Sequence, residues 1–203
     1  MTSQTPVGVE PGDRADPQRA ATAPARSEPG SGPAAFGVPP AGSVLRFLTT
    51  ALRAKAVVDI RTGSGDNARS LLDGMRPDGV LTSIDVDPSA QAEARRKLSE
   101  AGIGSGRARL ISGMAQDVLP RLAEDAYDLV LFDDRETEYP KYLRLGLRLL
   151  RPGGVLVFAR VRAPAPESSA AALRELHQLI EDDEDLVPTV LPVGTGLLAV
   201  ARW

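Results

Sequence analysis

The chain has 203 residues, a formal net charge of -3 and no cysteine. This length suits one domain with an appendage, and the lack of cysteine excludes disulfides, thiolate metal sites and a cysteine nucleophile. The net charge and the scattered arginines give no reason to expect nucleic acid or an anionic membrane as a partner. Without a secretory signal, or an apolar run of the roughly 18 residues that a membrane span needs, we expect a cytoplasmic protein.

Residues 1–36 are rich in proline, glycine, serine and alanine, and such a segment buries too little apolar surface to offset its loss of chain entropy. We therefore expect a disordered tail over residues 1–36 and one folded domain over residues 37–203. The first helix is expected just after Val38-Pro39-Pro40, because proline suits the first turn of a helix. Apolar residues recur at helical spacing from there to Leu52.

Short apolar runs alternate with amphipathic segments over the rest of the chain. The apolar runs predict strands at residues 56–60, 79–85, 108–111, 127–133 and 153–159, then two strands around a Gly-Thr-Gly turn. The intervening segments predict helices at residues 66–75, 88–102, 115–124, 138–150 and 168–183. Apolar strands separated by helices indicate a parallel sheet covered on both faces, whereas a short turn joins only antiparallel strands. The prediction is an α/β, doubly wound sheet with an antiparallel strand near one edge.

Polar residues follow the predicted strands at the edge where such sheets bind ligands. Gly63 and Gly65 come after the first strand, where glycine lets the backbone turn tightly and approach a ligand without a Cβ. Asp85 ends the second strand, 20 residues beyond Gly65, where a carboxylate accepts hydrogen bonds from both hydroxyls of a ribose. Together these residues predict a site for a nucleoside-containing cofactor.

Two such cofactors fit the loop. The spacing Gly63-x-Gly65-x-x-Ala68 matches a loose dinucleotide fingerprint, which leaves an NAD-dependent oxidoreductase open. Asp59 at the end of the first strand favours S-adenosylmethionine instead. A carboxylate there attracts the cationic amino-acid end of that cofactor and repels a pyrophosphate. The antiparallel C-terminal strands are also unlike a typical dinucleotide-binding half.

Five stretches, VVDIRTGSGDNARSLL, GVLTSIDVDP, ARLISGMAQDVLPRL, YDLVLFD and LLRPGGVLVF, occur in one order and spacing. On these stretches, residues 38–203 resemble the O-methyltransferase family that includes catechol and caffeoyl-CoA O-methyltransferases, and especially its small bacterial members. The resemblance implies S-adenosylmethionine as cofactor. It also implies a Rossmann-like, seven-stranded sheet, mostly parallel, whose last two strands are the antiparallel pair. Family members commonly pair, so we expect a homodimer.

The resemblance assigns one group of residues to the methionine end of the cofactor. Asp59 matches an acidic residue near that end, and Asn67 matches a position that often contacts the methionine carboxylate. Thr62, Gly63 and Gly65 match the cofactor loop between them.

A second group matches the rest of the cofactor and the acceptor. Asp85 matches the ribose-binding acid, Gln116 an adenine-edge contact, and Val38 a residue lining the cofactor pocket. Asp133 matches the aspartate that faces both cofactor and substrate, and it is the candidate catalytic residue. An aspartate at a strand end also commonly caps a helix or binds water, and an early helical glutamine is commonly solvent-exposed, so these alternatives stay open.

The chain departs from the family pattern at the first glycine of the loop, where it has Arg61. The larger residue either crowds the methionine end of the cofactor or binds its carboxylate through the guanidinium fork. The sequence leaves both outcomes open.

It departs again where metal-dependent members bind a divalent cation. Asp133 is kept, but Arg135 and Glu136 replace the family's Asp-Lys, and Ala159 and Arg160 replace its Asp-Asn pair. Because Mg²⁺ needs several oxygen ligands, we expect no metal. Arg160 is expected either to bind an anionic substrate or to neutralise Asp133.

The sequence thus predicts a metal-independent, S-adenosylmethionine-dependent O-methyltransferase acting on a hydroxyl of a small molecule. The absence of the family's metal ligands and lysine base leaves a non-catalytic protein of the same fold, with a binding or dimerisation role, as the alternative. An NAD-dependent oxidoreductase is the second alternative.

Overall fold

The computed structural model describes residues 39–164 and 166–203, so the tail expected at residues 1–36 and Val38 lie outside the described residues. Among the described residues, seven strands form one sheet in the order β3-β2-β1-β4-β5-β7-β6. The strands are β1 (Ala56–Ile60), β2 (Val80–Asp85), β3 (Ala108–Ser112), β4 (Tyr127–Phe132), β5 (Leu150–Ala159), β6 (Leu186–Leu191) and β7 (Leu197–Arg202).

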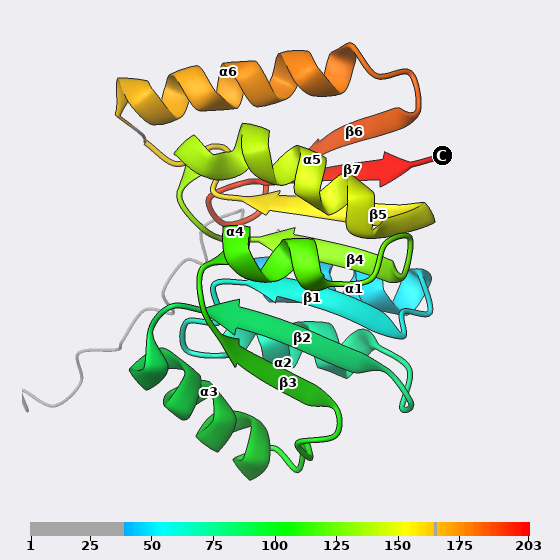
Figure 1. The fold of residues 1–203 in the computed structure, drawn as a ribbon, viewed down its shortest axis with the longest axis vertical. Helices are drawn as coiled ribbons and strands as arrows, with labels where there is room; N and C mark the ends of the chain where they lie inside the picture. Colours follow the sequence, from blue (N-terminus) through cyan, green and yellow to red (C-terminus); the bar gives the residue numbers. More distant parts are fainter. Residues whose placement is uncertain (1–38, 165) are drawn as a thin grey trace, which may run out of the picture. The chain divides into compact units, whose positions relative to one another are not determined.

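The direction of the strands confirms the predicted fold class. β1 is parallel to both β2 and β4, and β4 is parallel to β5. β7 is antiparallel to both of its neighbours, β5 and β6, and its arrow in Figure 1 points opposite to that of β5. The sheet is therefore Rossmann-like, doubly wound and mostly parallel, with an antiparallel C-terminal pair.

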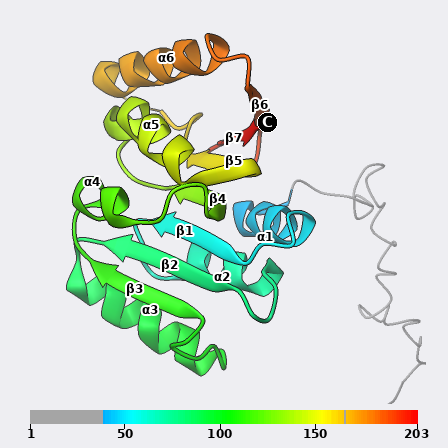
Figure 2. The same ribbon diagram turned by 45° about the vertical axis from the view of Figure 1, so that its right-hand side comes forward.

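Helices cover both faces of the sheet, as Figure 2 shows for α1 on one side and α5 on the other. The helices are α1 (Ala41–Ala51), α2 (Asp66–Gly74), α3 (Pro88–Glu100), α4 (Ala115–Val118), α5 (Tyr139–Leu149) and α6 (Glu167–Glu181), with 3-10 turns η1 (Leu119–Arg121) and η2 (Glu136–Glu138). One buried apolar cluster joins α1, α2 and α3 to the sheet, and a second joins α4, α5 and α6 to its other face. Each face thus has its own core.

Two elements differ from the prediction. The helix expected at residues 115–124 is only the single α-turn α4 followed by η1, because Pro120 lacks an N–H and its ring clashes with an α-helical continuation. β5 begins at Leu150 rather than residue 153, because Leu150 pairs with Tyr127 before an irregularity in the β4–β5 register.

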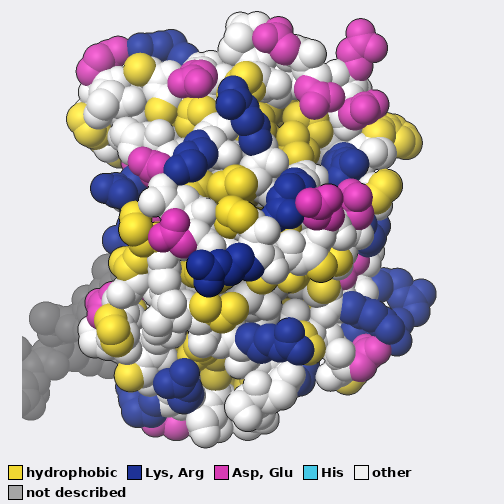
Figure 3. Space-filling view, viewed as in Figure 1, with side chains coloured by type: hydrophobic (Ala, Val, Ile, Leu, Met, Phe, Trp, Pro, Cys, Tyr) yellow, Lys and Arg dark blue, Asp and Glu magenta, His cyan; other side chains and the backbone are white. Residues whose placement is uncertain are grey.

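The surface carries charges of both signs (Figure 3). On the face shown in Figure 3, acidic and basic side chains are interspersed rather than gathered by sign. None of the helices in residues 39–164 and 166–203 has the length and apolar character needed to cross a membrane.

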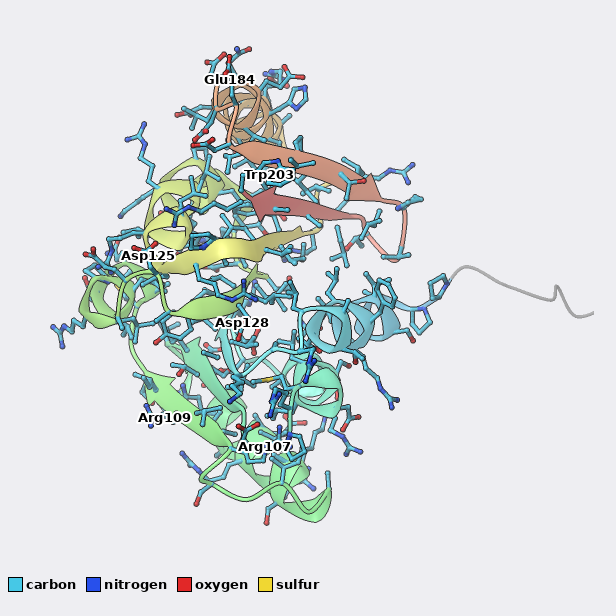
Figure 4. The ribbon with its side chains drawn as sticks, turned by 90° about the vertical axis from the view of Figure 1, so that its right-hand side faces the viewer. Arg107, Arg109, Asp125, Asp128, Glu184 and Trp203 are labelled. Atoms are coloured by element: carbon cyan, nitrogen blue, oxygen red, sulfur yellow. The ribbon has the colours of Figure 1, made fainter. Side chains whose placement is uncertain are left out.

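Asp128 stabilises the edge of the sheet at which the parallel strands begin, the edge that faces the viewer in Figure 4. Its carboxylate accepts hydrogen bonds from the backbone N–H groups of Lys55 (2.7 Å) and Ala56 (2.9 Å), and it pairs with Arg151 at 2.7 Å. Burial alone would raise the pKa of Asp128, but the N–H of Ala56 and the Arg151 guanidinium outweigh it and hold the pKa below its ordinary value. Asp128 therefore joins β1, β4 and β5 at the edge opposite the strand ends that carry the candidate residues.

Tyr139 plays the corresponding part at the other edge. Its fully buried hydroxyl lies 3.1 Å from the carbonyl oxygen of Phe132, 3.2 Å from that of Asp134 and 3.0 Å from that of Ala159. A single O–H shared among these carbonyls holds the ends of β4 and β5 together.

We expect Tyr139→Phe to lower the free energy of unfolding by about 1–3 kcal/mol, because it removes a buried hydroxyl donor from these carbonyl groups. Urea denaturation followed by circular dichroism measures the change. Tyr127→Phe is the matched control, since Tyr127 is only partly buried. Equal stability of the two variants would contradict this account of Tyr139.

Candidate functional site

Three cavities lie along the edge at which the parallel strands end. The large cavity has a volume of about 610 Å³ and is lined by Ile60, Arg61, Gly63, Ile84, Asp85, Val86, Asp87, Ala90, Gly113, Met114, Ala115, Gln116, Asp134, Arg135, Glu138 and Tyr142. The polar cavity, of about 360 Å³, is lined by Arg61, Thr62, Gly63, Ser64, Asp66, Asn67, Asp133 and Arg160. The small cavity, of about 180 Å³, is lined by Ala41, Leu45, Asn67, Leu131, Asp133, Ala159, Arg160, Val193, Thr195 and Leu197.

Neighbouring cavities have lining residues in common. Arg61 and Gly63 line both the large and the polar cavity. Asn67, Asp133 and Arg160 line both the polar and the small cavity. The site is therefore a row of three neighbouring cavities.

The loop after β1 turns sharply through left-handed backbone conformations. Arg61 has φ 73°, Gly63 has φ 49° and Gly65 has φ 84°. At Gly65 a Cβ would also come within 2.9 Å of the Cβ of Ala94 on α3, so glycine is required there for packing. Arg61, by contrast, adopts this conformation with a full side chain, at the position where the family pattern has glycine.

Asp85 joins the loops that follow β1 and β2. One oxygen of its carboxylate accepts the backbone N–H of Gly63 at 3.0 Å, and the other accepts that of Asp87 at 3.0 Å. The residue is only 8% exposed but lies on the wall of the large cavity. Because a carboxylate oxygen accepts more than one hydrogen bond, both oxygens keep capacity for a ligand.

Asp59 is fully buried. One oxygen of its carboxyl group accepts a hydrogen bond from the Ser83 hydroxyl at 2.7 Å, and that hydroxyl lies 2.7 Å from the hydroxyl of Thr62. The other oxygen finds no partner among the described residues. Burial, helped by the nearby charges of Asp133 and Asp85, raises the pKa of Asp59 to about 7. None of the three cavities is lined by Asp59, so its direct contact with a cofactor stays a prediction.

Asp133 lies at the centre of a charged cluster. Its carboxylate accepts a hydrogen bond from the Asn67 amide at 3.0 Å and lies 3.5 Å from Nε of Arg160. Arg160 Nε also lies 3.2 Å from Glu136. Burial raises the pKa of Asp133, although Arg160, Asn67 and Arg61 oppose that shift. The structure thus confirms that Arg160 faces Asp133, as one of the two sequence alternatives requires.

Gln116 lies on the wall of the large cavity, but its side chain is already engaged. Its carbonyl oxygen accepts a hydrogen bond from Lys141 at 2.7 Å. Two apolar neighbours on the same wall, Val86 and Met114, are 64% and 46% exposed. Their exposure leaves an apolar surface open to a ligand. This surface was not predicted from the sequence.

Ser83 and Tyr142 are two further residues of the site that were not predicted from the sequence. Ser83 lies directly beside Asp59 in the β1–β2 register, and a polar residue within the buried run of β2 was the available signal. Tyr142, on the wall of the large cavity, donates a hydrogen bond to Asp134 at 2.9 Å, and its spacing on α5 gave no sign of it.

The buried carboxyl group of Asp59 gives a prediction about pH. Its pKa is about 7 in the folded chain and 3.8 in a free side chain, so the folded state binds more protons between these values. Its contribution therefore makes the protein less stable as the pH rises from about 4 to 7, and the full cost remains above 7. Asp59→Asn should remove this dependence. We expect the free energy of unfolding of the variant, relative to that of the natural protein, to rise over this range by about 4 kcal/mol.

Chemical denaturation at a series of pH values measures this difference. Asp117→Asn, at an exposed carboxyl group, is the control and should show no such trend. A pH-independent difference for Asp59→Asn would mean that Asp59 is not buried as described.

Comparison with known proteins places this geometry in a family. The family model described as O-methyltransferase matches residues 34–203. A protein of Mycolicibacterium vanbaalenii with a provisional O-methyltransferase name is 48% identical over 171 residues, which cover 81% of this chain and 76% of the relative. Another, from Mycolicibacterium smegmatis and similarly named, is 42% identical over 209 aligned positions and covers 100% of both chains.

Solved structures agree with this assignment. The O-methyltransferase TomG from Streptomyces achromogenes, involved in tomaymycin synthesis and crystallised with S-adenosylmethionine, has a TM-score of 0.71 at 27% identity, covering 79% of this chain and 78% of that chain. The O-methyltransferase from Bacillus cereus in complex with S-adenosylhomocysteine has a TM-score of 0.71 at 22% identity, covering 83% and 84%, and shows the shared fold. The chain described here therefore belongs to the O-methyltransferase family.

Proposed function

We propose that the protein is a metal-independent, S-adenosylmethionine-dependent O-methyltransferase that methylates a hydroxyl group of a small molecule. The observation that supports this best is the row of three neighbouring cavities, with Asp133 and Arg160 lining both the polar and the small cavity. Such a row offers separate spaces for a nucleoside, for an amino-acid group and for an acceptor. Family membership favours this function over the oxidoreductase alternative.

We assign the nucleoside to the large cavity. Asp85 presents a carboxylate whose oxygens are fixed by backbone N–H groups, and such a group accepts hydrogen bonds from ribose hydroxyls. The exposed apolar side chains of Val86 and Met114 provide a surface for the adenine ring. Gln116 lies on the same wall and is the proposed contact for the adenine edge.

We assign the methionine end to the polar cavity. Asn67 and the guanidinium of Arg61 are the proposed partners of the carboxylate there, since Arg61 lies on the wall that joins the two cavities. Thr62 links this wall through Ser83 to Asp59, so the proposed influence of Asp59 on the cationic amino group passes through that hydroxyl pair.

We assign the acceptor to the small cavity, where Asp133 is the proposed general base. When bound, S-adenosylmethionine supplies a methyl group on a sulfonium sulfur. Asp133 takes the proton of the acceptor hydroxyl, and the acceptor oxygen then accepts the methyl group as its bond to sulfur breaks, which leaves a neutral thioether. Burial raises the pKa of Asp133, and a raised pKa brings a carboxylate closer to the range in which it is an effective base near neutral pH.

The residues around Asp133 do not fit a divalent cation. Within the described residues, no group of three or more His, Cys, Asp or Glu side chains is arranged to hold a metal. The carboxylates of Asp133 and Glu136 both lie near Nε of the Arg160 guanidinium. Mg²⁺ needs several oxygen ligands in an octahedral array, and the positive charge of Arg160 opposes it. A cytoplasmic location and a homodimer remain predictions.

Binding of S-adenosylhomocysteine, measured by isothermal titration calorimetry, tests the proposed function directly. We expect micromolar affinity that is the same with Mg²⁺ and with a chelator. Asp85→Asn should weaken binding about tenfold or more, because hydrogen bonds to a charged group contribute about 1.5–3 kcal/mol each. Glu93→Gln, at an exposed carboxylate on α3, is the control. No binding to the natural protein would favour the non-catalytic alternative.

Arg61→Gly separates the two roles open for Arg61. We expect the variant to bind S-adenosylhomocysteine about tenfold less tightly, because it loses a charge-assisted hydrogen bond. Its free energy of unfolding should also be higher by about 1 kcal/mol, because glycine adopts the positive φ without strain. Arg61→Ala, which removes the guanidinium and keeps the Cβ, should lose affinity without gaining stability. Tighter binding by Arg61→Gly would instead show that Arg61 crowds the cofactor.

A further inference from the structure

Arg160 is fixed at the end of β5 by groups on several sides. Its backbone has φ 58°, a left-handed conformation that side-chain-bearing residues adopt only where the surroundings require it. Its Nε lies 3.2 Å from Glu136 and 3.5 Å from Asp133, and its terminal nitrogen donates a hydrogen bond to the backbone carbonyl of Asp134. The side chain is 31% exposed, so the guanidinium is held in place while part of it stays accessible.

The two carboxylates that face Arg160 are themselves oriented. Asn67 donates a hydrogen bond to Asp133 at 3.0 Å, and Ser169 donates one to Glu136 at 3.3 Å. Nε of Arg160 is buried and forms no hydrogen bond in the part of the chain that the structure describes, although both carboxylates are near. The guanidinium is therefore positioned by charge. Because Nε is buried, the donor capacity for a ligand lies with the terminal N–H groups of this partly exposed side chain.

Arg160 and Asp133 form the charged end of the small cavity. Most of the remaining wall is apolar and comes from α1, β4, β5, β7 and the loop before β7, through Ala41, Leu45, Leu131, Ala159, Val193 and Leu197. Its volume of about 180 Å³ is below the roughly 300–1,000 Å³ of pockets for drug-sized ligands. The cavity thus suits a compact apolar body with one polar group directed at Asp133 and Arg160.

We propose that the guanidinium of Arg160 binds the acceptor oxygen directly and is the fixed cation of this site, and that the acceptor is a compact phenol with a single reacting hydroxyl. This proposal rests on the proposed function. The proton of the phenol moves to the carboxylate of Asp133, the oxygen bears the negative charge beside Arg160, and the oxygen–methyl bond then replaces the sulfur–methyl bond. A phenolic hydroxyl has a pKa of about 10, so a carboxylate assisted by a nearby cation can accept its proton. An alkyl hydroxyl is far less acidic.

The other charged and titratable groups near Arg160 come from four elements. Asp133 and Asp134 follow β4, Glu136 belongs to η2, Tyr139 to α5, and Arg61 follows β1. The side chain of Asp134 accepts a hydrogen bond from Tyr142, so only its backbone carbonyl is bound to Arg160. Since the negative groups are present in the natural protein and in every single variant of Arg160, a change on replacing Arg160 alone reports the guanidinium.

The test uses para-nitrophenol as the probe, because its ionised form absorbs visible light. The full-length protein is saturated with S-adenosylhomocysteine, and the absorbance of bound para-nitrophenol is titrated against pH in the presence of a chelator. We expect the apparent pKa of the bound probe to be about one to three units higher in Arg160→Gln than in the natural protein, since a nearby opposite charge shifts a pKa by that amount. Arg160→Lys, which keeps the charge and loses the fork, should lie between them.

Arg162→Gln is the matched control, because Arg162 is exposed and lines none of the three cavities formed by the described residues. Its probe pKa should equal that of the natural protein. If Arg160→Gln does not fold, the double variant Arg160→Gln with Glu136→Gln takes its place and is compared with Glu136→Gln alone. The two then differ only in the guanidinium, and the same shift is expected between them.

Two results would overturn the inference: an equal probe pKa with and without Arg160, or no binding of para-nitrophenol to the natural protein that has bound S-adenosylhomocysteine. In both cases the bound S-adenosylhomocysteine would leave the proposed function standing. Failure of S-adenosylhomocysteine to bind at all would instead count against the proposed function itself.

Discussion

Parallel pairing of β1 with β4 at the centre of the sheet decides where the polar groups of the site lie. The register places Ile60 beside Phe132, and the backbone N–H of Asp133 donates to the carbonyl of Ile60 at 3.2 Å. On the other side of β1, the N–H of Arg61 donates to the carbonyl of Ile84 at 2.8 Å. The three strands therefore end at one level. Because β3 and β2 lie to one side of β1 and β5 lies beyond β4, the loops diverge there and leave the row of cavities between them.

This convergence concentrates negative charge in a poorly solvated region. Asp59, Asp85 and Asp133 all come from adjacent strand ends, and the pKa values of Asp59 and Asp133 are raised, above all by burial. Arg61 and Arg160 supply the opposing charge, and both have positive φ values. A strained backbone costs about 1–3 kcal/mol for each residue. Its presence at two arginines in one site indicates that their charge interactions with the aspartates offset this cost.

The shape of the small cavity depends on a helix that lies far from the charged cluster in sequence. α1 contributes Ala41 and Leu45 to the wall, and its position is set by close packing on α2. The Thr49 hydroxyl donates to the carbonyl of Leu71 at 3.1 Å, and a Cβ on Gly74 would lie 2.2 Å from the carbonyl oxygen of Arg46. The packing of α1 on α2 therefore helps to set the size of the acceptor that we propose for this cavity.

The α/β class, the strands and most of the helices could be predicted from the sequence, because apolar runs and helical periodicity are local properties of the chain. The sequence also determined the loop glycines and the placement of Asp85 and Asp133 at strand ends, since these follow from position along each strand. Three features depend on the tertiary structure. The buried carboxyl group of Asp59 accepts a hydrogen bond from Ser83, whose hydroxyl also contacts that of Thr62. Lys141 donates a hydrogen bond to Gln116, and Arg160 lies near both Asp133 and Glu136. These outcomes depend on distances between side chains that are remote in sequence, and such distances exist only once the sheet has brought its strand ends together.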